Sequence, residues 1–207
     1  MEDQWLAWAK RLQSIASTGL HFCDEQYDRE RYTEVADIAN AMLARLGNVP
    51  IERIQGLISD FAQDYATPKI DVRGAVLEED KVLLVREASD GLWTLPGGYA
   101  DVGLSAGENV VKEIREEASL RVRASALYAV HHKAKHAYDP DVRDFYKLFF
   151  LCERLDDATP APGPETVDAG FFSPDDLPPL SRGRVVERDI RAAFAFRDGP
   201  DRLVQFD

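Results

Sequence analysis

LPGGYADVGLSAGENVVKEIREEASL, residues 95–120, holds the clearest structural signal in this sequence. It opens with the glycine pair 97–98, which suits a turn at the end of a short strand. Ser105 and Glu108 have the spacing of a capping box, so we expect a helix to begin there and to run to about Ala118. The stretch therefore predicts a strand, a glycine turn and an amphipathic helix in succession.

Three carboxylates share one face of this predicted helix. Glu113, Glu116 and Glu117 are spaced i, i+3 and i+4, whereas Val110 and Ile114 point to the other side. Such a cluster is most often a solvated acidic face, whose members repel one another by roughly 0.2–0.5 kcal/mol per pair. Carboxylates on a rigid element are also what Mg²⁺ binds, together with waters and substrate phosphates. The glycine turn before the helix favours the metal-binding interpretation.

The stretch resembles the Nudix box, the family pattern Gly-x5-Glu-x7-Arg-Glu-U-x-Glu-Glu-x-Gly-U, in which U is a bulky aliphatic residue. Counted from Gly98, the matching residues are Glu113, Ile114, Glu116, Glu117 and Leu120. The departures are Leu104 for the first Glu, Lys112 for Arg, and Ser119 for the last Gly. With its flanking features, the resemblance extends over residues 69–172.

Each departure has its own physical consequence. Leu104 removes one carboxylate, so a metal would depend on the helix trio and on carboxylates from elsewhere. Lys112 keeps the positive charge but lacks the bidentate fork that Arg offers to a carboxylate. Ser119 lies where the helix is expected to end, and a left-handed conformation there would cost roughly 1 kcal/mol relative to Gly.

Short motifs within the stretch narrow the resemblance to one branch of the family. These motifs are Asp101-Val-Gly-Leu-Ser105, Glu108-Asn109 and Lys112-Glu113. They are similar to the Nudix hydrolases that carry a helical N-terminal domain, which include CDP-choline pyrophosphatases and proteins labelled ADP-ribose pyrophosphatases. In that branch, Leu104 and Lys112 look like a variant of the box pattern and not like its loss.

The resemblance implies both a fold and a reaction. The fold is an α/β (α+β) Nudix-type α/β/α sandwich with a mixed sheet at residues 67–207, preceded by a small all-helical domain at residues 1–66. The reaction is the Mg²⁺- or Mn²⁺-dependent cleavage of a nucleoside diphosphate linked to another group. The helical domain favours CDP-choline, cleaved to CMP and phosphocholine. ADP-ribose or another nucleoside diphosphate sugar is the alternative, and a catalytically silent nucleotide-binding Nudix module is a third.

The resemblance also implies roles for particular residues. The expected metal ligands are the Gly97 carbonyl, Glu113, Glu116 and Glu117. Glu165 is the first choice for the general base because its loop could close over the site; the alternatives are Glu113 and then Asp168. The expected substrate-binding residues are Arg73, Lys112 and His132. Arg73 would be either an ordinary strand residue or a diphosphate contact. A phosphate or leaving-group contact could come from His132, Lys133 or His136, in a solvated loop at the end of the strand that reaches His132.

The first 66 residues read as three helices. Apolar residues recur at helical spacing before Gly19, again before Gly47-Asn48, and then over residues 51–61. Because a core of this size is marginal alone, we expect it to pack on the rest of the chain or to form a homodimer. Trp5 and Trp8 fit that packing, although an aromatic contact to a choline cation is an alternative.

From residue 69 the hydrophobic period changes to that of strands. The expected strands cover residues 69–77, 81–87, 92–95, 121–132, 145–152 and 167–172. A last helix is expected over residues 182–196, and residues 203–206 could form an edge contact.

Composition limits the partners. The net charge of −12 disfavours nonspecific binding to nucleic acid or to an anionic membrane, because such binding depends on basic patches. Cys23 and Cys152 form no CxxC motif, and no signal peptide is evident, which predicts a cytoplasmic protein. No apolar run approaches the roughly 18 residues needed to span a bilayer. The expected main partner is thus a small-molecule nucleoside diphosphate.

Overall fold

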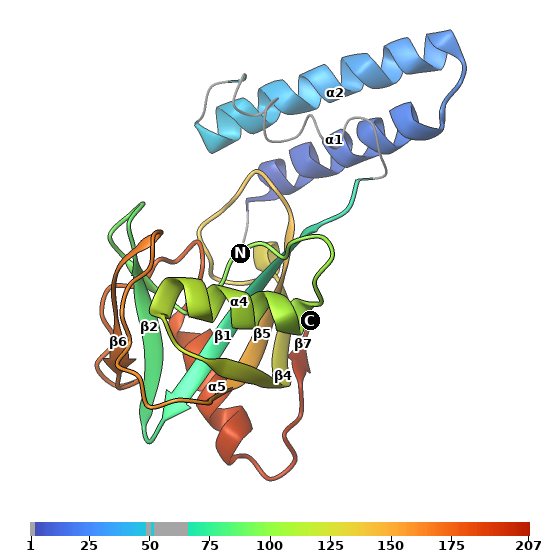
Figure 1. Cartoon of the computed structure of the whole chain (residues 1–207). Helices are drawn as coiled ribbons and strands as arrows, with labels where there is room; N and C mark the ends of the chain where they lie inside the picture. Colours follow the sequence, from blue (N-terminus) through green and yellow to red (C-terminus); the bar gives the residue numbers. More distant parts are fainter. Residues whose placement is uncertain (1–2, 49–50, 52–65) are drawn as a thin grey trace. The chain divides into compact units, whose positions relative to one another are not determined.

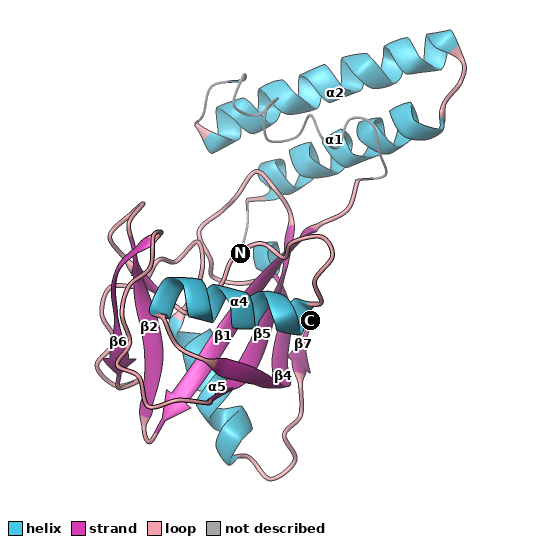
Figure 2. Ribbon diagram, in the orientation of Figure 1, coloured by secondary structure: helices cyan, strands magenta, loops and turns pink. Residues whose placement is uncertain are grey.

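The computed structural model describes residues 3–48, 51 and 66–207. These residues divide into two compact units (Figures 1 and 2). One comprises Met1–Lys69 together with Ala134–Phe145, and the other Ile70–Lys133 together with Tyr146–Asp207. The sequence-based boundary at residue 66 did not include the segment 134–145 in the N-terminal unit.

Two long helices build the described part of the N-terminal unit: α1 (Gln4–Phe22) and α2 (Gln26–Gly47). The prediction that the first helix ends at Gly19 is wrong, because α1 continues to Phe22. A Cβ at Gly19 would overlap the ring of Tyr32 on α2. Gly19 therefore allows the close approach of the two helices and does not stop the first.

The second helix ends as predicted, with Asn48 in the left-handed conformation after Gly47. The predicted third helix, over residues 51–61, falls almost wholly outside the described residues. Leu6, Ala9 and Leu43 form a small core between the helices. Trp5 and Trp8 are not part of it, being 59% and 48% exposed.

The larger unit is built on a mixed sheet. Its strands are β1 (Lys69–Glu78), β2 (Lys81–Glu87), β3 (Trp93–Thr94), β4 (Val122–His132), β5 (Phe145–Arg154), β6 (Thr166–Phe172) and β7 (Gln205–Phe206). The order is β3-β2-β1-β5-β4-β7, and β6 also pairs with β2. β2 pairs antiparallel with β1, β3 and β6, and β4 pairs antiparallel with β5. β7 runs parallel to β4, so the predicted edge contact of residues 203–206 is confirmed.

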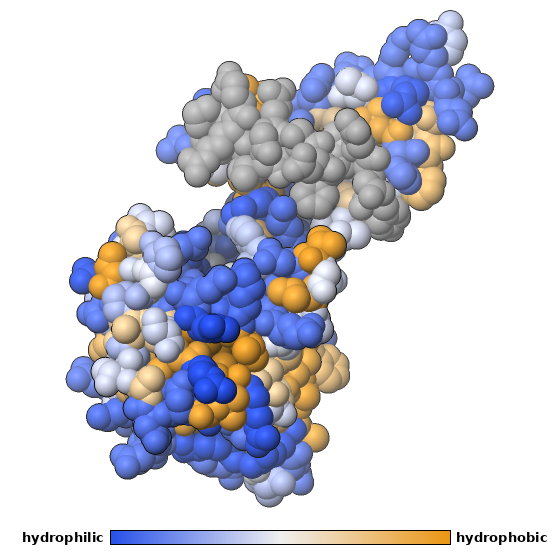
Figure 3. Space-filling model, in the orientation of Figure 1, coloured by the Kyte–Doolittle hydropathy of each residue, from blue (hydrophilic) through white to orange (hydrophobic). Residues whose placement is uncertain are grey.

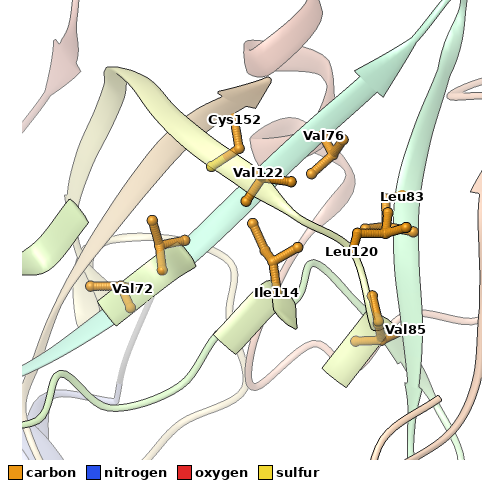
Figure 4. Close-up of a cluster of buried hydrophobic side chains, with 10 residues drawn as sticks. Val72, Val76, Leu83, Val85, Ile114, Leu120, Val122 and Cys152 are labelled. Atoms are coloured by element: carbon orange, nitrogen blue, oxygen red, sulfur yellow. The ribbon is translucent and has the colours of Figure 1, made fainter. Parts of the chain in front are cut away.

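One helix covers each face of the sheet (Figure 1). Helix α4 (Ala106–Ala118) packs Val110 and Ile114 against β1 and β2, and Figure 4 shows Ile114 in this cluster of apolar side chains. Helix α5 (Glu187–Asp198) packs Phe196 near Tyr128 of β4, on the other face. The predicted α/β/α sandwich is confirmed, although α5 begins later than the expected residue 182 because residues 181–186 form turns.

Among the described helices, none has both the length and the apolar character that a membrane span requires.

Candidate active site

Helix α4 begins and ends where the sequence indicates. The Glu108 amide donates to Ser105 Oγ at 3.2 Å, and the Ser105 amide donates to Glu108 Oε2 at 2.7 Å, which completes the capping box. Ser119 follows the helix with φ 57°, in the left-handed region. A Cβ at Gly74 of β1 would overlap Ile114, so the helix lies directly on this strand. That contact fixes which face of α4 meets the glycine turn.

The glycine turn after β3 is bound to β1. The Val72 amide donates to the Gly98 carbonyl and the Gly74 amide to the Pro96 carbonyl, each at 2.9 Å. Gly97 adopts φ 146°, and a Cβ there would overlap the Val72 carbonyl oxygen. Only glycine fits this position, which allows the turn to lie against the strand.

Two carboxylates of the helix trio face this turn. Glu117 is buried, and its Oε2 accepts a hydrogen bond from the Gly97 amide at 2.8 Å. The carboxyl group of Glu113 lies 3.3 Å from where a Cβ on Gly98 would stand. Because these two residues are one helical turn apart, their carboxylates line the same edge of the glycine turn.

Glu116, the third member, is more exposed and is bound by Lys112. The Lys112 ammonium lies 3.3 Å from Glu116, 3.0 Å from Asp101 and 4.0 Å from Glu113. Hydrogen bonds with Asp101 and then Glu116 raise the pKa of Lys112. Lys112 therefore connects the trio to the loop before the helix, although it lacks the fork of the family's Arg.

The negative charge at the turn is only partly compensated. Burial raises the pKa of Glu117 to about 7; Arg73 and the Gly97 amide act against this rise, whereas Glu87 and Glu113 add to it. Burial likewise raises the pKa of Glu113, with Lys112 opposing, and Glu165 is among the acidic residues that contribute. The trio, Glu87 and Glu165 thus influence one another electrostatically.

Glu87 was missed by the sequence analysis. It ends β2, is buried, and lies 3.2 Å from the guanidinium of Arg184. Burial raises its pKa, Arg184 and Arg73 oppose that rise, and Glu165 adds to it. The strand pattern alone gave no signal that distinguished Glu87 from an exposed residue at a strand end.

Arg73 belongs to a buried charge network with Asp71 and Lys147. The Arg73 guanidinium donates to both Asp71 oxygens at 3.0 and 2.9 Å and to the Leu95 carbonyl at 3.2 Å. The Lys147 ammonium donates to Asp71 at 2.7 Å. Burial alone would raise the pKa of Asp71, but the two cations lower it to about 2. Arg73 thus binds the Leu95 carbonyl, just before the glycine turn, and its positive charge opposes the rise in the pKa of Glu117.

The structure places the two other base candidates on β6 and just before it. Glu165 is exposed at the end of the loop after β5, and its backbone carbonyl accepts from the Ala88 amide at 3.0 Å. This bond places it beside the end of β2, where Glu87 lies. Asp168 is exposed and pairs in register with Arg86.

β4 ends at His132, as predicted, but the residues that follow it, Lys133–Lys135, form a 3₁₀ turn with Lys133 buried, in place of the expected solvated loop. His131 is buried in the sheet, where its ring lies against Phe149. The His132 ring packs edge-on against Tyr146 of β5. β5 lies between β4, which carries His132, and β1, which carries Arg73, so the two residues are not on neighbouring strands.

The site residues fit a hard divalent cation by the chemistry of their donors. Within the described ranges, no group of three or more acidic, His or Cys side chains is already gathered at metal-binding distance. The donors offered are carboxylates of α4 and a backbone carbonyl of the glycine turn, the oxygen types that Mg²⁺ prefers. Uncompensated negative charge at Glu113 and Glu117 is what a cation would neutralise.

The loop that joins β3 to α4 is hydrogen-bonded to the helix beside these carboxylates. The buried Asn109 accepts from the Asp101 amide at 2.8 Å and donates to the Leu104 and Ser105 carbonyls at 3.3 and 3.1 Å. Val102 and Leu104 are nevertheless exposed, and Figure 3 shows apolar atoms on this loop. Leu104, which replaces the first Glu of the box, is therefore an exposed apolar residue of this loop, as is Val102.

Comparison with known proteins agrees with this geometry. The NUDIX domain model matches residues 68–194, and the model of the UDP-X-like, N-terminal oligomerisation domain matches residues 3–58. The Bacillus subtilis (strain 168) protein named "Putative ADP-ribose pyrophosphatase YjhB" is 42% identical over 207 residues, covering 100% of this chain and 99% of the relative.

Solved structures give the same result. One described as a UDP-X diphosphatase is 31% identical and covers 98% of each chain, with a TM-score of 0.64. An ADP-ribose pyrophosphatase from Streptococcus suis 89-1591 is 43% identical and covers 68% of this chain and 100% of its own, with a TM-score of 0.62. The box helix, the glycine turn and these matches together show that the chain belongs to the Nudix family.

Proposed function

We propose that this Nudix enzyme hydrolyses the diphosphate of a nucleoside diphosphate linked to a second group, with Mg²⁺ as its cofactor. The observation that supports this most is the placement of Glu113 and Glu117 against the Gly97-Gly98 turn. Both carboxylates have a raised pKa, so the site favours the arrival of positive charge. A diphosphate bound beside the glycine turn would share the positive charge of the metal ion with these carboxylates.

The roles that we propose for the site residues are supported by the positions of Glu113 and Glu117. Glu116, Glu117 and the Gly97 carbonyl would hold the metal ion, and Glu113 would bind it or orient a ligand. When bound, the ion screens the diphosphate and lowers the pKa of the attacking water. Glu165 would take the proton of the attacking water as the water oxygen bonds to phosphorus, while the bond from phosphorus to the leaving phosphate oxygen breaks. A carboxylate already on the metal would be a poorer base, which favours Glu165.

The substrate proposed first is ADP-ribose, since the full-length relative bears that name. The matched structure described as a UDP-X diphosphatase supports the wider class of nucleoside diphosphates linked to a second group. CDP-choline, the substrate expected from the sequence, stays a prediction. These three substrates share the diphosphate and differ at its two ends.

We also propose that the chain forms a homodimer through its N-terminal helices. The matched domain model is described as an oligomerisation domain. On α1, Trp5, Trp8 and Ile15 lie at helical spacing and are all exposed in the single chain. Exposed apolar residues arranged in a stripe are typical of an interface between helices.

A hydrolysis panel with Mg²⁺ tests the proposed function. It compares ADP-ribose, CDP-choline, a UDP-sugar, NADH, a diadenosine polyphosphate and a nucleoside triphosphate, with product phosphate released by a coupled phosphatase. Wild type should prefer one diphosphate diester, and Glu116→Gln and Glu117→Gln should lose nearly all turnover. Glu153→Gln, an exposed change on β5, is the control and should keep it. Unchanged turnover in Glu117→Gln would remove the metal assignment.

A further inference from the structure

The loop between β5 and β6, residues 155–165, is fastened to the end of helix α4. The last carbonyls of a helix have no partner within it. Here the Ala161 amide donates to the Ala118 carbonyl at 3.1 Å, and Thr166 Oγ1 donates to the Glu117 carbonyl at 2.8 Å. A Cβ on Gly163 would overlap the Glu116 carbonyl oxygen. The loop backbone therefore lies directly on the turn of helix that carries the expected metal ligands.

The Thr166 hydroxyl is the central link of this attachment. While it donates to the Glu117 carbonyl, it accepts a hydrogen bond from the Gly163 amide at 2.8 Å. The side chain is buried, so water does not readily replace either bond. One hydroxyl thus joins the loop to the helix and at the same time fixes the shape of the loop.

Glu165 is held between this link and the sheet. Its carbonyl accepts from the Ala88 amide at 3.0 Å, and the next residue, Thr166, pairs with Glu87 at a register shift where Val167 of β6 is the extra residue. Irregularities of this kind often redirect a side chain beside an active site. The loop of Glu165 is thus attached to α4 through Ala161 and Thr166, and to the end of β2 through the Glu165 carbonyl.

We propose that Thr166 is a positioning residue, which holds the Glu165 carboxylate in place relative to α4 so that it can accept a proton from the attacking water. The inference rests on the proposed function and on Glu165 as the base. Thr166 itself touches no reacting atom. Its effect is indirect: it sets the distance between the Glu165 carboxylate and the attacking water, to which proton transfer is sensitive.

The test compares Thr166→Val, which keeps the shape and removes the hydroxyl, with Thr166→Ser, which keeps the hydroxyl. With the best substrate of the panel, Thr166→Val should lower kcat about 10²-fold while KM changes less than about twofold. Thr166→Ser should stay within about threefold of wild type. Mn²⁺ affinity, measured by electron paramagnetic resonance, should be unchanged in both. Thr33→Val on α2, whose hydroxyl bonds to the Arg29 carbonyl, is the matched control and should keep wild-type kinetics.

A double-mutant cycle separates positioning from simple loss of structure. In a Glu165→Gln background, Thr166→Val should cost little further kcat, because the group it positions is already gone. If Thr166→Val fails to fold, Ala161→Pro removes the second loop-to-helix bond without changing a buried side chain. That variant should show the same loss in kcat alone, at a smaller size.

Several outcomes would overturn the inference: equal losses in both backgrounds, a Thr166→Ser enzyme as slow as Thr166→Val, or a kcat loss accompanied by weaker Mn²⁺ binding. A wild-type kcat in Glu165→Gln would remove Glu165 as the base, and the inference with it. Failure of the proposed function is distinguishable from all of these, because wild type would then hydrolyse nothing in the panel.

Discussion

Asp71 and Glu117 are two buried carboxylates in the same unit, and their pKa values are shifted in opposite directions. Asp71 is paired with both Arg73 and Lys147, and despite burial its pKa falls to about 2. Glu117 receives one backbone amide and a share of the charge of Arg73, and burial raises its pKa to about 7. The charge of Asp71 therefore stabilises the fold, whereas the charge of Glu117 is only partly compensated until a cation binds.

The largest expected effect is on catalysis at Glu117. Glu117→Gln keeps the shape and the hydrogen bond from Gly97 but removes the charge that would bind the metal. We expect kcat to fall about 10³-fold with any substrate of the panel, since metal stabilisation of the transition state is worth several kcal/mol. Steady-state kinetics measures this, with Glu153→Gln as the control. A fall of less than about tenfold would mean that Glu117 is no more functional than Asp71.

The next effect is on stability at Asp71. Asp71→Asn leaves Arg73 and Lys147 buried without their anion, so we expect the free energy of unfolding at pH 7 to drop by about 3–5 kcal/mol. Because the folded pKa of Asp71 is below the unfolded value of 3.8, its contribution is present above that pH and is lost as the pH falls toward about 2. Urea denaturation of both proteins measures the drop. A loss as small as that of Glu153→Gln, about 1 kcal/mol or less, would contradict the role given to the network.

The same kind of change at Glu117 should have the opposite sign. The folded pKa of Glu117 lies above its ordinary value of 4.5, so metal-free stability falls as the pH rises from about 4.5 to about 7. In EDTA at pH 7 we therefore expect Glu117→Gln to be more stable than wild type, by on the order of 2 kcal/mol. Its denaturation midpoint should also vary less over that pH window. A variant that is destabilised at pH 7 would show that the Glu117 charge is already compensated.

The smallest effect concerns the end of the box helix. Ser119 occupies the left-handed conformation where the family has Gly. Ser119→Gly should raise the free energy of unfolding by about 0.5–1 kcal/mol by removing that strain, and kcat should be unchanged. Ser119→Ala keeps the strain and should give no gain. If both variants match wild type in urea, the helix end carries no strain that matters.

Local signals in the sequence predicted the box helix well. The capping box at Ser105, the helix end near Ala118 and the spacing of Glu113 and Glu117 all depend on residues within one helical turn of each other. Such relations can be read from spacing alone, and so can the strands, whose hydrophobic period is two. This part of the fold was predictable because its causes are local.

Relations between distant residues were not predictable. Asp71 and Lys147 are separated by 76 positions, and Thr166 bonds to a carbonyl 49 positions away. Gly19 looked like a helix stop because nothing in the sequence shows that Tyr32 packs against it. The burial of His131, near the end of an expected strand, depends on how β4 pairs with β5. Which charges are compensated, and which are not, is therefore known only from the fold.

Mn²⁺ binding measured by electron paramagnetic resonance tests the central claim most directly, because it needs no knowledge of the substrate. Wild type should bind Mn²⁺ in competition with Mg²⁺, Glu116→Gln and Glu117→Gln should each bind at least about tenfold more weakly, and Glu153→Gln should match wild type. Equal affinity in wild type and Glu117→Gln would contradict the claim that the carboxylates of α4 hold the metal.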